Sequence, residues 1–327
     1  VVWVAVGAGV NYVYVTRHAP APEPRTSVAF HVHTTDREKY NVLLPVANPA
    51  SVGPLAAIAR DFARAKAGTV TLLHVITVPR ATLPSAARHL ADPVKPFLQH
   101  AAEQFPADVP VNSIIKIAHD AASAILETAE EEGTDLILLG WRGSPTFREH
   151  ILGSTLDPVV REAPCDVGVL RDGRGGEPRR VVIAARGRGK HAKRGAELAA
   201  ALARARGAGM LAVTVITPGG HAEPEARLAS VVADAGIGPW EIKFKSVRAP
   251  TAEAGLLMAA GPGDLLVLGA SEEAAWRTHL FGTIPERVAA RSEASVLLVK
   301  RQTPSSAWMA RVARKAGQAV EYLKPEK

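Results

Sequence analysis

Short apolar runs alternate with stretches of helical apolar spacing from Tyr40 onward. In the first half of the chain, the runs predicted as strands are 41–46, 69–78, 111–118, 135–139 and 165–170. The stretches predicted as helices are 55–67, 121–133 and 155–161. Asp120 directly precedes the second helix and can cap it. Strands that alternate with helices and are largely apolar throughout predict a parallel sheet covered on both faces.

The same succession repeats after a polar, glycine-rich segment at 171–178. Here the predicted strands are 180–185, 210–217, 240–247, 264–269 and 295–299, and the predicted helices are 192–206, 222–235 and 251–260. The run that ends at Gly269 matches the run that ends at Gly140, and each is followed thirteen residues later by another glycine. We therefore predict an α/β fold with two tandem Rossmann-like domains at 40–172 and 179–301, each a five-stranded parallel sheet with helices on both faces.

The two ends of the chain carry different patterns. Residues 1–15 are apolar and uncharged, and basic residues follow at 17–18. This run is shorter than the roughly 20 residues that span a bilayer, so we interpret 1–18 as the end of a truncated transmembrane helix with cytoplasm beyond it. A strand or helix of a soluble domain is the alternative.

Residues 19–39 are predicted to be a proline-containing linker that includes a short edge strand at 27–33. At the other end, 305–327 has the pattern of a basic amphipathic helix. Two interpretations stay open for that helix: it lies on an anionic membrane surface, or it packs against its own domain.

Composition narrows the functional classes. The chain has 39 Lys and Arg against 32 Asp and Glu, yet aromatic residues are few and do not interleave with the basic ones, which argues against nucleic acid as a partner. A single cysteine, Cys165, excludes an internal disulfide and suits a reducing compartment, where it is expected to be a buried small side chain. His31 and His33 would share one side of the edge strand, but no third ligand is near, so no metal site is predicted.

The candidate chemistry lies after the fourth strand of the first half. Gly140 ends that strand, Gly143 follows, and Gly153 and Ser154 come directly before a predicted helix. A strand, a glycine loop and a helix N-terminus together offer backbone N–H groups to a phosphate, at the strand ends where such sheets bind ligands. The alternative is that the glycines only permit a tight turn.

Enzymatic features are weak near this loop. There is no P-loop lysine, no Ser-His-Asp spacing and no pair of carboxylates. His74 and His119 lie near predicted strand ends, and a packing or surface role is expected for both. Glu130 to Glu132 are expected to form a solvated face. We predict no catalytic residues, with slow nucleotide hydrolysis left open.

These motifs resemble a known family. The pattern Gly-x2-Gly-x9-Gly-(Ser/Thr) after a strand, together with Leu72-Leu73-His74-Val75-Ile76 and Ala163-Pro164-Cys165-Asp166-Val167, is similar to the universal stress proteins. The resemblance covers 40–171 and, less completely, 179–300. The preceding apolar segment and Leu44-Pro45-Val46-Ala47-Asn48-Pro49 resemble the cytoplasmic tail of an amino-acid permease of the amino acid–polyamine–organocation superfamily.

The resemblance implies an adenine nucleotide alpha hydrolase-like fold and a nucleotide site. By analogy with the family, the site residues would be Pro45, Val46, Ala47, Val75, Gly140, Gly143, Gly153, Ser154 and Thr155. Ala47 stands where the family has an acidic residue, so one side-chain anchor for the nucleoside is missing. The ligand implied is ATP or AMP, with or without Mg²⁺.

The corresponding positions of the second domain depart from the pattern. They are Arg186, Val215, Gly269, Glu272, Gly282 and Thr283. Glu272 replaces the middle glycine and brings negative charge to a phosphate position, and Arg186 could pair with it. We predict that this second site is degenerate and binds no nucleotide.

Three functions follow from the resemblance. The first is a nucleotide-binding regulatory sensor on the cytoplasmic face of the inner membrane, forming the tail of an amino-acid transporter. The second is a structural module that dimerises and stabilises the transporter, and the third is a cyclic dinucleotide sensor. In each, the closing strands at 167–170 and 295–299 are expected to pair within one chain, and a homodimer is expected.

Overall fold

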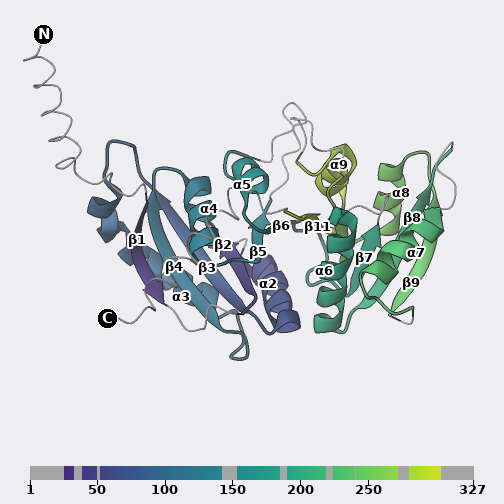
Figure 1. The fold of residues 1–327 in the computed structure, drawn as a ribbon, viewed down its shortest axis with the longest axis horizontal. Helices are drawn as coiled ribbons and strands as arrows, with labels where there is room; N and C mark the ends of the chain where they lie inside the picture. Colours follow the sequence, from purple (N-terminus) through teal and green to yellow (C-terminus); the bar gives the residue numbers. More distant parts are fainter. Residues whose placement is uncertain are drawn as a thin grey trace, which may run out of the picture.

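A computed structural model of the chain describes residues 26–32, 39–49, 52–141, 153–184, 190–218, 224–239, 241–271 and 280–302 (Figure 1). Eleven strands of these residues form one sheet in the order β1-β4-β3-β2-β5-β6-β11-β10-β7-β8-β9. The predicted ends of the chain, 1–18 and 305–327, lie outside the described residues. Among the described helices, none combines the length and apolarity needed to cross a bilayer.

We call the part of the sheet from β2 to β6, with its helices, the first unit. It contains β2 (Asn41–Pro45), α2 (Val52–Lys66), β3 (Thr69–Thr77), η2 (Pro84–Val94), α3 (Lys95–Ala102), β4 (Val111–Ala118), α4 (Ala121–Glu131), β5 (Leu136–Gly140), α5 (Leu156–Glu162) and β6 (Asp166–Arg171). The five strands are parallel in the order β4-β3-β2-β5-β6. Val42, Leu43 and Leu44 in the central strand β2 are fully buried, as a strand covered on both faces requires.

The second unit repeats this arrangement. It contains β7 (Arg180–Ala184), α6 (Lys190–Arg206), β8 (Gly209–Ile216), α7 (Pro224–Asp234), β9 (Ile242–Arg248), α8 (Ala252–Ala259), β10 (Asp264–Gly269), α9 (Thr283–Arg291) and β11 (Ser295–Lys300). Its strands are also parallel, in the order β9-β8-β7-β10-β11. The α/β class and the five parallel strands of each half are therefore confirmed.

Strand β1 (Thr26–Val32) lies in the segment 19–39 interpreted as a linker, and it adds a sixth strand to the sheet of the first unit. It pairs antiparallel with β4 and covers the outer edge of that strand, as the alternating pattern at 27–33 predicts. Part of the predicted linker is thus a member of the sheet. β1 thereby replaces β4 as the edge strand of the sheet.

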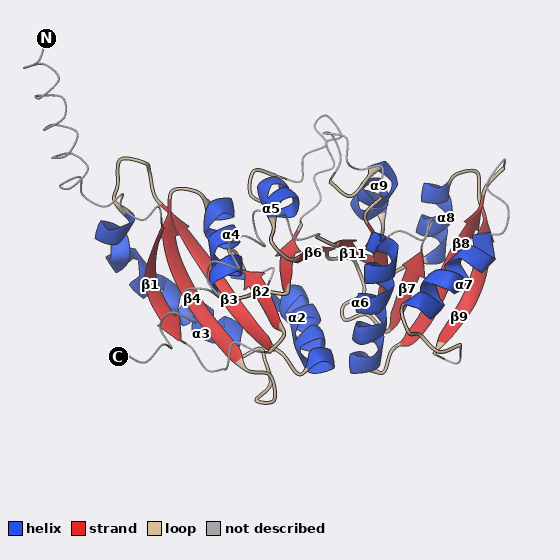
Figure 2. Cartoon of the chain, in the orientation of Figure 1, coloured by secondary structure: helices blue, strands red, loops and turns tan. Residues whose placement is uncertain are grey.

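The two units join through their closing strands. β6 and β11 pair antiparallel, with Val169 opposite Leu298, so the expected pairing of the closing strands within one chain is confirmed. Helices α2 and α6 lie side by side beneath this junction (Figure 2). The result is one sheet whose two halves have antiparallel strand directions.

Helices cover both faces of the sheet, and each face has one core that runs through both units. On one face, Phe62 of α2 and Leu202 of α6 belong to the same buried cluster. On the other face, Val160 of α5 and Val288 of α9 share a second cluster. The two units therefore bury apolar surface jointly rather than as separate globules.

The glycine-rich segment between the units is tightly bound to the second unit. Arg174 N donates to Glu293 O at 2.7 Å, and Gly263 N donates to Arg174 O at 3.0 Å. A Cβ built on Gly173 would lie 2.3 Å from the carbonyl carbon of Ala294, so only glycine permits this approach. The segment predicted as a break between domains is a fixed connection.

Between the predicted strands at 69–78 and 111–118, the structure contains two helices that the sequence pattern does not predict. Residues 84–94 form the 3-10 helix η2, and Lys95–Ala102 form α3. Pro84 and Pro93 interrupt the regular helical pattern, which conceals these turns from a periodicity search. Leu98 and Ala101 nevertheless face the core and are buried.

Candidate functional site

The crevice of the first unit lies where the strand order reverses. β2 stands between β3 and β5. From β2 the chain first continues outward through β3 to β4 on one side, and later through β5 to β6 on the other side. Ligands of open parallel sheets bind outside the carboxyl ends of the strands at such a point. Pro45 ends β2 and Gly140 ends β5, so both candidate residues lie at this switch point.

Two hydrogen bonds to β3 fix the segment that follows β2. Val46 N donates to Leu73 O at 2.8 Å, and the Nδ1 atom of His74 lies 2.8 Å from Val46 O. Because Pro45 pairs with Leu73 in the parallel ladder, Ala47 emerges next to Val75. The structure thus brings these four candidate residues of the first unit together at the ends of β2 and β3.

His74 holds this segment in place. A carbonyl oxygen can only accept, so Nδ1 of His74 carries the proton and donates to Val46 O. The ring packs edge-to-face against Phe97 of α3 with centroids 5.7 Å apart. Burial lowers the pKa of His74, which favours the neutral imidazole. His119 makes a similar contact with Val78 O at 3.2 Å, so both histidines take the packing role expected for them.

The glycines of the loop are placed at its two ends. Gly140 closes β5, and the next residue, Trp141, continues the ladder by donating its N–H to Leu170 O at 2.8 Å. Gly153 has a φ of +132°, a conformation that favours glycine over any residue with a side chain. Gly143 lies outside the described residues.

Within the described residues, no side chain caps the start of α5. Thr155 is its N-cap residue, but the threonine side chain makes no capping hydrogen bond. By contrast, Asp120 caps α4 by accepting from Ser123 N, and Thr251 caps α8 by accepting from Ala254 N. Ser154 is exposed beside this uncapped end. Helix α5 packs its Val159 into the same core as Leu139 of β5, which holds the helix near the end of that strand.

In the second unit, backbone atoms approach the corresponding glycines closely. A Cβ built on Gly269 would lie 2.5 Å from His191 O, because the first turn of α6 comes directly against the end of β10. At the other end of the loop, Ser271 N donates to Phe281 O at 2.7 Å. A Cβ on Gly282, whose φ is +103°, would lie 2.7 Å from the Cβ of Ser271. Here the two ends of the loop contact each other.

A carboxylate that the sequence analysis missed also contacts this second loop. Oε1 of Glu286 accepts from Leu280 N at 2.7 Å and from Phe281 N at 2.9 Å. The carboxylate is buried and satisfies N–H groups that precede the glycine. Glu286 is an acidic residue in the first turn of α9, whose N-cap is Gly282, and such a position is the sequence signal that could have drawn attention to it. Val215 lies near the end of β8, whereas Arg186 and Glu272 are outside the described residues.

Groups suited to catalysis do not gather at the described part of the crevice. Among the described residues, no three His, Cys, Asp or Glu side chains are placed to hold a metal ion. Burial raises the pKa of the Cys165 thiol, and its side chain packs against the apolar core. The expectation of a small structural side chain fits this placement.

Comparisons with known proteins agree with this architecture. Residues 40–171 match the model of the universal stress protein family. A Na⁺/H⁺ antiporter of Synechocystis sp., NhaS5, is 33% identical over 136 residues, which make up 40% of this chain and 19% of the antiporter. The chain thus matches only a small part of that relative's length.

Two solved structures share the fold. A universal stress protein from Archaeoglobus fulgidus has a TM-score of 0.54 at 18% identity, covering 80% of this chain and 96% of that one. The cytoplasmic domain of a prokaryotic cation chloride cotransporter also has a TM-score of 0.54, at 14% identity, covering 84% of this chain and 99% of that one. Residues 40–171 thus match the universal stress protein family, and the described chain has an α/β fold that the cytoplasmic domain of a transporter shares.

Proposed function

We propose that the chain is a nucleotide-responsive regulatory part of a membrane transporter, in which the first unit binds an adenine nucleotide such as ATP or AMP. The observation that carries the proposal is the convergence at one crevice of the segment from Pro45 to Ala47, Val75 and Gly140. Beside them the uncapped start of α5 carries Ser154. The family resemblance gives the adenine nucleotide as the ligand class, and backbone groups supply most of the recognition.

The second unit is proposed to bind no nucleotide. Three features support this: the approach of His191 O to Gly269, the contact between the loop ends at Ser271 and Phe281, and the occupation of two N–H groups by Glu286. In the described part of this loop, these contacts take up space and two N–H donors that a phosphate would need. The unit is then a degenerate copy that completes the sheet and the shared cores.

The proposed location is the cytoplasmic face of the inner membrane, and the similarity to an antiporter and to a cotransporter's cytoplasmic domain supports it. For the nucleotide to regulate a transporter, its affinity must differ between two transporter states. An amino-acid permease remains our proposal for the kind of transporter, from the resemblance of 44–49 to such tails.

A structural module is the second candidate. The antiparallel pairing of β6 with β11 and the two cores that run through both units favour it, since these contacts join the two units without any ligand. In this case the chain would stabilise a transporter, as a monomer or a homodimer, and nucleotide would have no effect.

Titration calorimetry on the chain from Pro24 to Lys327 separates these functions. With ATP, AMP and cyclic di-AMP as ligands, we expect one adenine nucleotide to bind per chain. Gly143→Glu, which copies the second unit's Glu272, should abolish binding because it places a carboxylate at a phosphate position. Binding of none of the three below millimolar concentration would favour the structural module, and binding of cyclic di-AMP alone would identify a dinucleotide sensor.

A further inference from the structure

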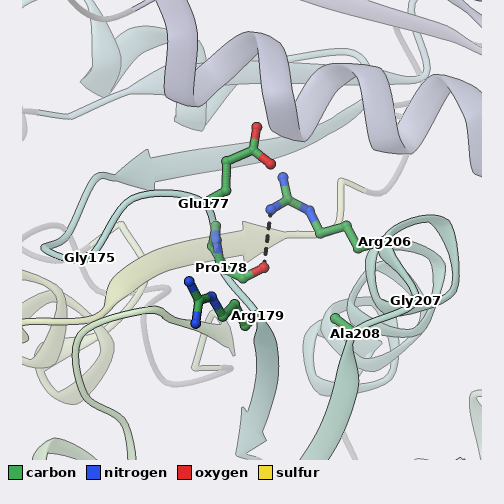
Figure 3. Close-up of a pocket in the computed structure, with 7 residues that line it drawn as sticks. All are labelled: Gly175, Glu177, Pro178, Arg179, Arg206, Gly207 and Ala208. Carbon is green, nitrogen blue, oxygen red and sulfur yellow. Dashed lines mark hydrogen bonds between the residues drawn. The ribbon is translucent and has the colours of Figure 1, made fainter.

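A second pocket lies where the connection between the units meets the turn between α6 and β8. Its volume is about 480 Å³, and its lining residues are Gly175, Glu177, Pro178, Arg179, Arg206, Gly207 and Ala208 (Figure 3). Arg179 precedes β7 and Ala208 precedes β8. The pocket is therefore at the amino ends of the strands, whereas the nucleotide is proposed to bind at the carboxyl ends.

The Arg206 guanidinium at this pocket is buried but incompletely satisfied. Only 7% of its side chain is exposed, and its Nε forms an ion pair with Oδ2 of Asp61 from α2. Nη1 donates to Pro178 O at the long distance of 3.5 Å, as Figure 3 shows. Nη2 has no hydrogen-bond partner within the part of the chain that the structure describes. An unpaired donor at a buried charge is costly, and an oxyanion acceptor would remove that cost.

The single buried carboxylate near Arg206 is shared. Asp61, which is 2% exposed, also pairs with Arg60 at 3.0 Å. The other acid at the pocket, Glu177, is 68% exposed in its side chain and lies 3.8 Å from Arg60. Arg179 is exposed, and the described residues give it no ion-pair or hydrogen-bond partner for its side chain. Arg60 and Arg206 thus share the buried carboxylate of Asp61, Glu177 approaches only Arg60, and Arg179 adds a third guanidinium at the pocket.

From this geometry we infer that the pocket is a binding site for a small oxyanion, a phosphate or a carboxylate group, bound by Arg206 and by the Arg179 side chain, which also lines the pocket. A guanidinium offers a planar fork of N–H donors that matches two oxygens of such an anion. The Glu177 side chain also lines the pocket, next to the position of the anion, and moves into solvent when the anion binds. The volume also accommodates a small organic molecule that carries the anionic group.

This site would link the two units. Arg206 belongs to α6 of the second unit, its ion-pair partner Asp61 belongs to α2 of the first, and Arg179 belongs to the connection between them. An anion that neutralises the excess positive charge at this junction favours the closed contact of α2 with α6. Anion binding at this pocket would thereby affect the contact between the two units independently of nucleotide binding.

The test uses the intact chain carrying Gly143→Glu, so that phosphate binding at the proposed nucleotide site does not contribute. Inorganic phosphate and malonate are titrated separately by calorimetry at constant ionic strength, with chloride as the reference. We expect saturable binding of one anion, and the preferred probe tells whether phosphate or carboxylate chemistry is recognised. Arg179→Gln should weaken binding roughly tenfold, the effect of losing one charge-assisted contact. Glu177→Gln should strengthen it, because a competing carboxylate is removed.

Arg174→Gln is the matched control. Arg174 belongs to the same connection but pairs with Glu293 at 3.0 Å outside the pocket, so its loss should leave anion affinity unchanged. Absence of saturable binding of both anions would overturn the inference, as would equal affinity in the Arg179→Gln variant and its parent. Neither result bears on ATP binding by the unmodified chain, so failure here is distinct from failure of the proposed nucleotide site.

Discussion

Single residues of the glycine pattern serve different physical needs. Gly153 needs a positive φ but has open space around its Cβ position, whereas Gly269 is required by the backbone of α6. Gly140 faces only the flexible side chain of Leu55, whose Cδ1 would lie 3.0 Å from an added Cβ. The spacing of glycines therefore cannot by itself distinguish a ligand cradle from a tight turn. What favours a ligand in the first unit is that Pro45, Val46, Ala47 and Val75 lie beside Gly140 at the carboxyl ends of β2, β3 and β5.

Asp120 gives a prediction at the scale of one side chain. Its carboxylate accepts from the Ser123 side chain and from Ser123 N at 2.7 Å, and these bonds lower the pKa of Asp120. Asp120→Ala should reduce the free energy of unfolding by about 1 kcal/mol at pH 7, measured by urea denaturation. Because the folded pKa is the lower one, the stabilisation is present above about pH 4 and is lost as the pH falls through the folded value.

The control for this prediction is Asp120→Asn. Asparagine also caps helices, so its variant should keep most of the stability at pH 7 but lack the loss on acidification that this carboxylate contributes. An unchanged difference between Asp120→Ala and the parent chain at pH 3 and pH 7 would contradict the role assigned to the ionised carboxylate.

At the scale of elements, the pattern of apolar positions predicts most helices and strands because each follows a local period. It fails at 84–102, where prolines interrupt the period and packing against β4 and β1 forms the helices instead. It also fails for Glu132, expected in a solvated face but only 7% exposed, whereas the neighbouring Glu131 is half exposed and its Oε2 lies 2.7 Å from Nζ of the fully buried Lys116. Burial of a lysine on a sheet face depends on a partner that no local pattern reveals.

Helix packing predicts that substitution by alanine destabilises the protein at Gly255 and stabilises it at Gly195. A Cβ on Gly255 of α8 would lie 2.3 Å from Cγ1 of Val215 in β8, whereas one on Gly195 of α6 would make an ordinary contact at 3.4 Å. Gly255→Ala should lower the free energy of unfolding by about 1–3 kcal/mol through overpacking. Gly195→Ala should raise it by a few tenths of a kcal/mol or more, because alanine favours the helix.

Thermal and chemical denaturation of the two variants would measure these changes. Adding Val215→Ala to Gly255→Ala should recover part of the lost stability, since it removes the methyl groups in contact. If the double variant were as unstable as the sum of the single ones, the contact between α8 and β8 would not be the cause.

At the scale of the whole molecule, the junction of β6 with β11 decides the architecture. In the full chain β11 occupies the outer edge of β6, and the cores on both faces continue through it. A chain of residues 26–171 would present that edge unpaired, together with the uncovered side of α2. An exposed, apolar edge strand is a template for pairing with a second copy.

We therefore expect residues 26–171 to form a dimer through β6, with the full chain lacking this contact. Light scattering coupled to size exclusion would measure both masses. Adding a separate chain of residues 172–327 should convert the dimer into a one-to-one complex, because β11 is the natural partner of β6. If the fragment of residues 26–171 is a monomer at micromolar concentration, the unpaired edge of β6 contributes little to association between chains.

The sequence by itself determined the order of strands and helices, the repetition of that order, and the position of the glycine loop at the carboxyl end of β5. These features follow from local periods and from the conformations that single residue types permit. Only the tertiary structure decided how β6 pairs with β11, how His191 O meets Gly269, and how Arg206 shares Asp61 with Arg60. Each of these joins residues that are distant along the chain, and packing and charge across the two units select them.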